Sequence, residues 1–349
     1  MHALSAPDAI SPAIARTRDF LFRPFRWGTY LKLGLVAMIT EGFTNSHSSS
    51  GHGGHPTRNA PSVTSSFYLS PGLIALIVVG VLVAIVVALV IFYLVTRLRF
   101  AYFHCLVHDN RYIRPGWRLY RDQATRFFWF SVLVGICFLL LAAGMLLPFA
   151  AGLFHLIRQL APGGHPNLLQ VLALVLPMIP IVLLLVLAGF LSDVVLRDWM
   201  LPHFALDNAT AGQAWAQVWA RLTAEKRQFF VYTLLRVLLP TIAFIGLFLL
   251  LMIPGFFAVG ATAMFGFGIH SALAGATGAS SVIAIVFEVF FGILAFGVVL
   301  LASICVAGPV CTAIREYALL FYGGRYQTLG NLLDPPTSPS PNFAPSQPA

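Results

Sequence analysis

The chain has 349 residues, of which 58% are hydrophobic and only 9% are charged. A soluble domain carries roughly 25% charged residues, so this composition excludes a water-soluble fold and makes the lipid bilayer part of the solvent. The net charge of +9 does not indicate nucleic-acid binding, because the arginines lie between apolar runs, which is the pattern of membrane topology.

The first 28 residues predict an amphipathic segment rather than a cleaved signal peptide. They contain four arginines but no apolar core of the kind that a signal peptide needs. Ser11 can cap a helix, and Pro12 suits its first turn. We therefore expect residues 1–28 to be retained and to lie along the cytoplasmic membrane surface.

Charge-free apolar runs predict the membrane-spanning helices, because about 20 apolar residues cross the hydrocarbon as a helix. The six predicted spans are 29–43, 71–96, 127–149, 168–191, 229–253 and 282–307. The first is short and carries Lys32 and Glu41, which can snorkel to opposite surfaces. We expect an all-α polytopic membrane helix bundle, with three helical hairpins in one transmembrane domain of residues 29–330. The Pro/Ser-rich tail 331–349 is predicted to be disordered.

The distribution of basic residues predicts the orientation of these spans. Seventeen arginines and lysines fall on one side of the six-span arrangement, whereas only Arg58 and Arg158 fall on the other. Lysine and arginine prefer the cytoplasmic face. The sequence therefore predicts that both termini are cytoplasmic.

One long stretch leaves the number of spans open. Residues 237–287 contain no Asp, Glu, Lys or Arg. A single helix over these 51 residues would be about 77 Å long. We expect this stretch to break at Pro254 and Gly255. The Gly-rich segment 255–275 is then re-entrant, surface-lying or a seventh span. A seventh span would place the last arginines on the opposite side, against the charge distribution.

A repeated phrase marks the predicted cytoplasmic surface. Asp109-Asn110 precedes Trp117 by the same spacing that separates Asp207-Asn208 from Trp215. Thr210 and Gln213 have capping-box spacing, and the residues after them form an apolar helical stripe. We expect an amphipathic interfacial helix before each hairpin, as an internal repeat. The predicted lipid-headgroup contacts are Arg118, Arg121, Arg126, Trp117, Trp215 and Trp219.

Three stretches carry a resemblance to a known group of proteins. They are ARTRDFLFRPFRWGTYLKLG (residues 15–34), DNRYIRPGWRLYR (residues 109–121) and REYALLFYGGRY (residues 315–326). These stretches resemble an uncharacterised family of bacterial six-span integral membrane proteins, which is distantly similar to the membrane domain of some glycerophosphodiester phosphodiesterases. The resemblance implies a location in the bacterial cytoplasmic (inner) membrane and carries over no catalytic residue.

The search for catalytic and metal-binding motifs predicts no catalytic residue, cofactor or metal. Phosphate-binding loops, zinc helices and nucleophile elbows are missing from the sequence. His104 and Asp109 have the spacing of glycerolipid acyltransferases, in which the histidine is a general base; alternatively, Asp109 only begins the Asp-Asn turn. His47, His52 and His55 form either a weak metal-binding arm or a solvated linker.

Charged residues inside the predicted spans are the remaining candidates for a functional site, because a charge in the bilayer must pair or snorkel. Arg236 can snorkel or pair with Asp193. Glu288 and Glu41 are both predicted near the outer ends of their spans. They form a two-carboxylate site for a cation or proton; alternatively, Glu288 is only a protonated or water-exposed side chain near a helix end.

Two main functions follow from these patterns. The first is a noncatalytic organiser of lipid or partner proteins, whose partners are the bilayer and its anionic cytoplasmic headgroups. The alternative is a transporter or permease with a site between helices, and a lipid-modifying enzyme is the third. A cavity that reaches the bilayer midplane and is lined by Glu288 or Arg236 favours the transporter, whereas a solidly packed bundle favours the organiser.

Overall fold

Every element in the described part of the chain is helical. The computed structural model describes residues 3–42, 71–160, 168–273 and 279–334. The elements in chain order are α1 (Ile10–Phe22), α2 (Trp27–Ala37), the π-helical turn η1 (Met38–Gly42), α4 (Pro71–Val107), α5 (Ile113–Leu119), α6 (Arg121–Leu160), α7 (Leu168–Val194), the π-helical turn η3 (Val195–Met200), α8 (Leu201–Leu206), α9 (Ala211–Ala224), α10 (Lys226–Leu273), α11 (Ala279–Gly323) and α12 (Gln327–Leu333).

Five of the described helices are long and apolar enough to cross a membrane. They cover Ile74–Val107, Arg121–Leu156, Val171–Leu206, Lys226–Leu250 and Val289–Gly323. The sequence-based expectation of an all-helical membrane protein is confirmed at this level. The last five predicted spans overlap these ranges, and each lies within one of the full helices α4, α6, α7, α10 and α11.

The first predicted span has a different structure. Residues 29–42, the described part of this span, belong to α2 and η1, which together cover 27–42 and reach about 24 Å as a regular helix. The hydrocarbon core is about 30 Å thick. This pair is therefore not among the five helices that are long enough to cross.

The expected break at Pro254 and Gly255 is wrong. Helix α10 runs without interruption from Lys226 to Leu273, through both residues. Proline is tolerated within apolar membrane helices, where neighbouring helices and local adjustments satisfy the freed backbone groups. Helix α11 packs against α10 and supports it.

The buried core lies at one end of the molecule, which we call the head. The head comprises α1, α2, η1, α5, η3, α8, α9 and α12, together with the adjoining ends of the five long helices. Its centre is aromatic: the ring of Tyr232 stacks on Phe321 at 4.3 Å and on Tyr317 at 5.2 Å between centroids. Aromatic side chains of this size bury large apolar areas, so the head is held together by packing.

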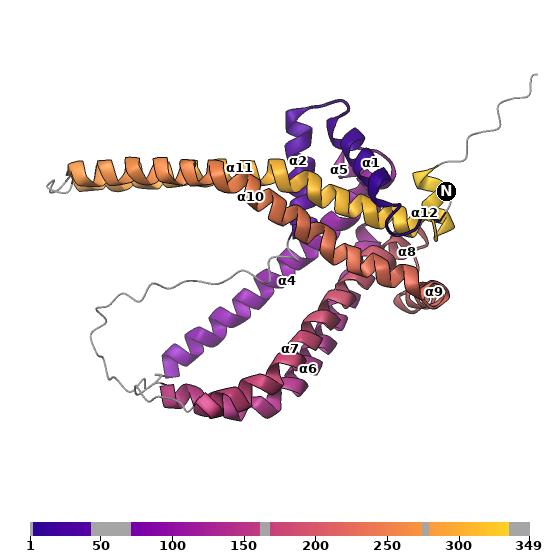
Figure 1. The fold of residues 1–349 in the computed structure, drawn as a ribbon, viewed down its shortest axis with the longest axis horizontal. Coiled ribbons are helices and arrows are strands. Elements are labelled where there is room, and N and C mark those ends of the chain that lie inside the picture. The colour runs from indigo at the N-terminus through magenta and orange to yellow at the C-terminus, as the bar shows by residue number, and fades with distance from the viewer. Residues whose placement is uncertain (1–2, 43–70, 161–167, 274–278, 335–349) are drawn as a thin grey trace, which may run out of the picture.

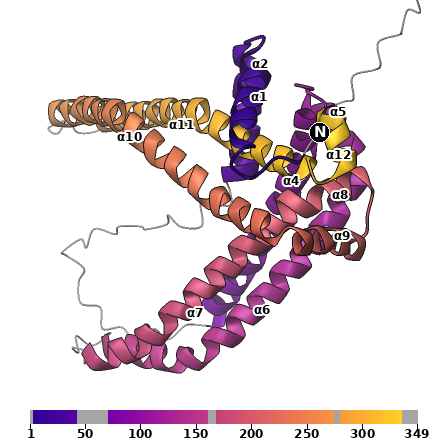
Figure 2. The same ribbon diagram turned by 45° about the vertical axis from the view of Figure 1, so that its right-hand side comes forward.

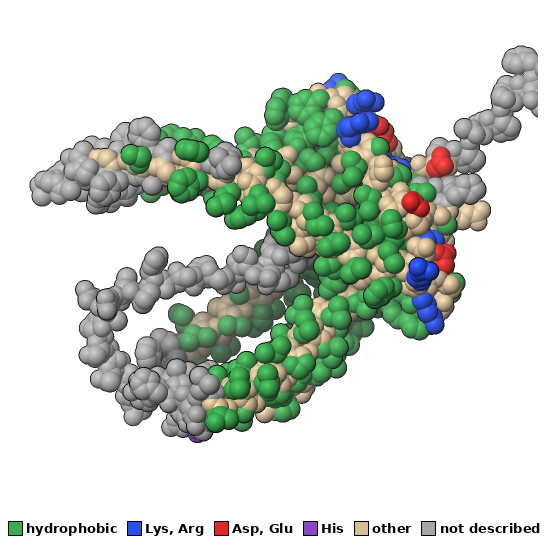
Figure 3. Space-filling model, in the orientation of Figure 1, with side chains coloured by type: hydrophobic (Ala, Val, Ile, Leu, Met, Phe, Trp, Pro, Cys, Tyr) green, Lys and Arg blue, Asp and Glu red, His purple; other side chains and the backbone are tan. Residues whose placement is uncertain are grey.

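Two arms extend from the head and diverge from each other (Figures 1 and 2). One arm contains α4, α6 and α7, and the other contains α10 and α11. Their large apolar side chains are exposed, and Figure 3 shows hydrophobic atoms along both arms while charged atoms gather over the head. Soluble monomers rarely expose more than a few hundred Å² of contiguous apolar surface. The arms are therefore the lipid-facing part of this membrane protein.

The two ends of the described chain meet in the head. Helix α1 packs along α11, and the Arg16 side chain donates a hydrogen bond to the carbonyl of Leu333 at 3.3 Å. The Arg325 side chain donates to the carbonyl of Leu4 at 3.0 Å. Residues near both ends of the described chain therefore lie on the same side of the arms.

Candidate functional site

A cavity of about 770 Å³ lies where the two arms leave the head. Most of its lining side chains are apolar, and all five long helices contribute: Phe92 from α4, Phe127, Val134 and Phe138 from α6, Leu185, Val186 and Phe190 from α7, Pro240 and Phe244 from α10, and Ile314 from α11. Ligand pockets are typically clefts of about 300–1,000 Å³ with mainly apolar walls and a few placed polar groups.

Seven charged side chains gather at the head end of this cavity, and we call them the charged floor. They are Glu41, Arg99, Asp193, Arg197, Asp198, Arg236 and Arg315. Five of the seven line the cavity, whereas Asp198 and Arg315 bond to the others from within the head. Charged residues are almost never buried unless they are paired, so this cluster in so apolar a chain marks a candidate site.

Two π-helical turns bring parts of the charged floor into place. The turn η1 carries Glu41, and η3 carries Arg197 and Asp198. The π-helix is rare and occurs frequently at functional sites, because its wider turn redirects side chains. The charged floor thus combines two irregular turns with α4, α7, α10 and α11.

Asp198 is the centre of the pairing. Its carboxylate accepts from the Arg236 Nε at 2.9 Å and from an Arg315 terminal nitrogen at 3.0 Å. The Tyr232 hydroxyl donates to the same carboxylate at 2.8 Å. Charge-assisted hydrogen bonds are roughly twice as strong as neutral ones, so this aspartate ties α10 and α11 to η3.

Three of the predicted site residues meet here, with different partners from those expected. The Arg236 guanidinium pairs with Glu41 at 2.8 Å as well as with Asp198. Asp193 instead pairs with the Arg197 Nε at 2.7 Å. The predicted pairing of Arg236 with Asp193 is therefore replaced by two pairings across different elements.

Arg99 differs from the other arginines of the charged floor. Its Nε donates to the carbonyl of Thr40 at 3.3 Å, and it forms no ion pair with a carboxylate among the described residues. The side chain is buried, with 9% of the residue exposed, and it lines the cavity. Four arginines face three carboxylates in the charged floor, which leaves one positive charge in excess.

Glu288 does not join Glu41 in a two-carboxylate site. Its side chain lies outside the described residues, but its backbone belongs to α11. Arg315 of the charged floor follows 27 residues later on the same helix, which is about 40 Å along the axis. Glu41 lies in the charged floor, near Arg315, and pairs there with Arg197 and Arg236.

Sequence reasoning missed Arg99, Arg197, Asp198 and Arg315 as site residues. The three arginines lie just beyond predicted span ends, so they were counted among the cytoplasmic charges. The signal that could have found them is helical continuity: the long helices extend past the apolar runs, and Asp193 and Arg197 have the i,i+4 spacing of a helical ion pair.

The predicted lipid-headgroup residues lie on the surface of the head, with one exception. Trp215 and Trp219 on α9 stack on each other and are 47% and 53% exposed. The side chains of three arginines are also exposed: Arg118, Arg121 and Arg126. Trp117 is half-buried, because the Arg97 guanidinium lies 4.5 Å from the centre of its ring.

The repeated Asp-Asn phrase has a structural role at helix ends. Asp109 and Asn208 adopt positive φ angles of 49° and 51°, each two residues after the end of its helix, α4 or α8. Aspartate and asparagine tolerate this left-handed conformation better than other non-glycine residues. The predicted capping box of Thr210 and Gln213 at the start of α9 is confirmed.

The acyltransferase-like pair does not form in the described structure. The His104 ring packs on His108, and its Nδ1 has no hydrogen-bond partner among the described residues. In the second copy, the His203 Nδ1 lies 3.1 Å from the Asp207 carboxylate. The histidines at 47, 52 and 55 lie outside the described residues. Within the described ranges, no three His, Cys, Asp or Glu side chains are grouped as metal ligands.

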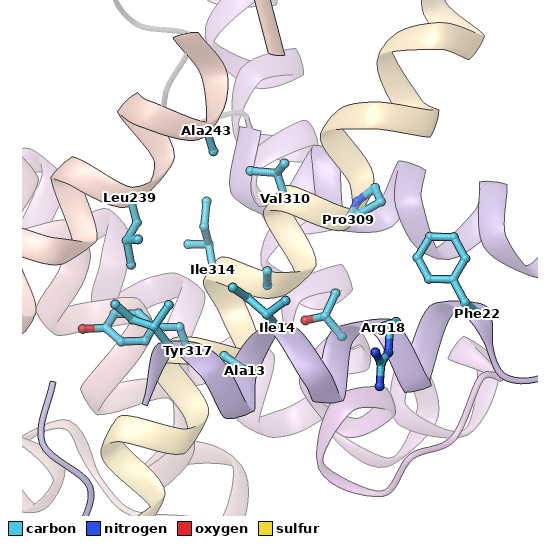
Figure 4. A pocket seen from close by; sticks show the side chains of 13 residues that line it. Ala13, Ile14, Arg18, Phe22, Leu239, Ala243, Pro309, Val310, Ile314 and Tyr317 are labelled. Carbon is cyan, nitrogen blue, oxygen red and sulfur yellow. The ribbon is translucent and has the colours of Figure 1, made fainter. Parts of the chain in front are cut away.

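A second cavity, of about 360 Å³, lies beneath α1. Figure 4 shows Ile14 and Phe22 of α1 on one side, with side chains of α10 and α11 opposite. Its walls are almost wholly apolar, and Arg18 is the charged residue that lines it. Ile314 lines both cavities, but no residue of the charged floor lines the smaller one.

Comparisons with known proteins identify a family and no activity. No curated protein shows significant similarity to the chain, and no solved structure does so either. The predicted likeness to the membrane domain of phosphodiesterases stays a prediction. A family described as a family of unknown function (DUF7544) matches residues 4–332, so the chain belongs to the DUF7544 family.

Proposed function

We propose that this multi-pass membrane protein binds an amphiphilic, lipid-like ligand in the cavity between its arms. The observation that carries this proposal is the combination of apolar walls and a buried charged floor in one cavity. An acyl chain suits the walls formed by α6, α7 and α10, and a polar headgroup suits the arginines at the head end.

The cavity favours a site between helices over a purely noncatalytic organiser. A solidly packed bundle would have left Arg236 enclosed by protein, whereas Arg236 lines a cavity of about 770 Å³. The cavity borders the lipid-facing arms, so a ligand from the bilayer needs no passage through water. Binding of a lipid is common to an organiser of lipid and to a lipid transporter, and the cavity supplies the binding step of either.

The proposal includes an orientation in the membrane. The head lies at the cytoplasmic face of a bacterial inner membrane, and an even number of crossings, six as predicted, places both termini there. The packing of α1 against α11 and the bond from Arg16 to Leu333 support a common side for the two ends. The exposed Trp215 and Trp219 suit the headgroup layer, where tryptophan is enriched.

A bulky substitution in the cavity wall tests the binding site. Gly135 of α6 lines the cavity, and a Cβ atom there would meet no atom within 4 Å. Gly135→Trp therefore fills the cavity without a backbone clash. Gly144→Trp on the same helix is the matched control, because Gly144 is equally open but does not line the cavity.

The measurement is native mass spectrometry of the full chain after purification in a mild detergent. We expect the wild-type chain and Gly144→Trp to retain the same number of bound lipids, and Gly135→Trp to retain fewer. Equal retention by all three proteins would contradict the proposed function.

A further inference from the structure

The charged floor has a charge imbalance that points to a particular class of ligand. Four arginines and three carboxylates leave one positive charge. Ion pairs connect six of the seven side chains, and the seventh, Arg99, lines the same cavity. The segment 43–70, which lies outside the described residues, contains no Asp or Glu that could supply the missing anion. Burying an excess charge away from water is unfavourable unless an opposite charge accompanies it.

Arg99 is where the excess charge is located. The other three arginines each pair with a carboxylate of the charged floor: Arg197 with Asp193, Arg236 with Asp198 and Glu41, and Arg315 with Asp198. Arg99 bonds only to the Thr40 carbonyl among the described residues. A guanidinium has five N–H donors and stays protonated in proteins, so Arg99 cannot lose its charge and has donors left for an anion.

From this we infer that the ligand is a monoanionic phosphodiester lipid whose phosphate pairs with Arg99. This inference rests on the proposed function and adds the chemical class of the ligand. One negative charge balances the charged floor. A zwitterionic headgroup would leave the excess charge and would bring a further cation beside four arginines. A phosphomonoester approaches two negative charges near neutral pH and would overshoot the balance.

The geometry fits this class of ligand in two respects. Arginine binds phosphate oxygens through two parallel N–H donors, and Arg99 lines the cavity with its side chain otherwise buried. The apolar walls begin directly beside it, since Phe92 on the same helix and Phe127 on α6 line the same cavity. A phosphate at Arg99 would therefore have its acyl chains along the walls.

Substitution of Arg99 tests the inference through thermal unfolding of the full chain in nanodiscs. The probes are nanodiscs of phosphatidylcholine alone and of phosphatidylcholine mixed with phosphatidylglycerol. We expect phosphatidylglycerol to raise the midpoint of the wild-type protein. Arg99→Met should abolish that rise and weaken phosphatidylglycerol binding about tenfold or more, because one charge-assisted pair is lost. Arg227→Met, at an exposed arginine of the head that is not one of the predicted headgroup contacts, should keep the full rise.

The direction in which the thermal midpoint changes in phosphatidylcholine alone separates ligand binding by Arg99 from a structural role of this residue. In phosphatidylcholine alone, Arg99→Met should raise the midpoint, because it removes an uncompensated buried charge. Arg236→Met should lower it, because it removes one arginine partner from each of two carboxylates, Asp198 and Glu41. Arg99→Lys keeps the charge and should retain part of the phosphatidylglycerol effect; this variant decides the matter if Arg99→Met fails to fold.

Three outcomes would overturn the inference. The first is an undiminished response of Arg99→Met to phosphatidylglycerol, and the second is a lower midpoint of Arg99→Met in phosphatidylcholine alone. The third is equal stabilisation by inorganic phosphate or soluble glycerophosphate, which would make the ligand a free anion. If Gly135→Trp still reduces lipid retention in any of these cases, the proposed function stands without the phosphodiester.

Discussion

Two tyrosines of the head show how sharply single residues differ at this site. Tyr232 and Tyr317 stack on each other and are both buried. The Tyr232 hydroxyl donates to Asp198 at 2.8 Å, whereas the Tyr317 hydroxyl has no partner among the described residues. The same polar group in nearly the same place therefore stabilises the charged floor in one case and remains unsatisfied in the other.

Removing the Tyr232 hydroxyl and the Tyr317 hydroxyl in separate variants tests whether the bond to Asp198 stabilises the protein. Tyr232→Phe should lower the free energy of unfolding by about 1–3 kcal/mol, because a buried carboxylate loses a donor while the ring packing is kept. Tyr317→Phe is the matched control and should be neutral or slightly stabilising. Thermal unfolding of both variants in the same detergent measures the difference. Equal destabilisation would mean that ring packing, and not the bond to Asp198, sets the stability here.

At the scale of elements, the approach of α2 to α11 positions Glu41. A Cβ atom at Gly308 would lie 2.7 Å from the Cα atom of Gly34. Real Cβ atoms essentially never approach a backbone atom this closely, so a side chain at Gly308 would require α2 or α11 to shift. Since η1 follows α2 directly, this contact determines where Glu41 meets Arg236.

An added methyl group at Gly308 should displace α2. Gly308→Ala is expected to cost about 1–3 kcal/mol, the usual range for overpacking, and to weaken the Glu41 pairing. Gly297→Ala on the same helix is the control: no atom lies within 4 Å of its added Cβ, and alanine is the better helix former by about 1 kcal/mol. The thermal midpoint should fall for the first variant only. A tolerated Gly308→Ala would show that α2 does not need this close approach.

The elements also show what could be predicted from the sequence and what could not. The last five spans follow from charge-free apolar runs, because the bilayer demands long apolar helices. The break at Pro254 was mispredicted, since the continuity of α10 there depends on packing against α11. The crossing by residues 29–43 stays a prediction. The charged floor joins residues as distant in the chain as Glu41, Asp198 and Arg315, and no local pattern specifies such pairing.

At the scale of the whole molecule, the head and the arms carry side chains that suit different surroundings. The charged residues gather over the head and the apolar ones cover the arms (Figure 3). The cavity lies at the boundary between these regions, next to both the lipid-facing helices and the buried arginines. An amphiphile in a bilayer has the same division, with its headgroup at the boundary and its chains in the hydrocarbon.

Cysteine labelling tests this division. Arg118 lies in the head and Met264 lies far along α10, and both are exposed. In a background without the four natural cysteines, a membrane-impermeant maleimide added to intact cells should label Met264→Cys but not Arg118→Cys. Both should react after the membrane is permeabilised. Labelling of Arg118→Cys in intact cells would contradict a cytoplasmic head.

The most direct test of the account is a density map of the full chain in nanodiscs that contain phosphatidylglycerol, determined by electron microscopy with a bound antibody fragment. We predict an elongated density in the cavity, with its head about 2.7–2.9 Å from the Arg99 guanidinium. The account is contradicted if α7 and α10 close the cavity, or if a carboxylate of the chain occupies the place of the phosphate at Arg99.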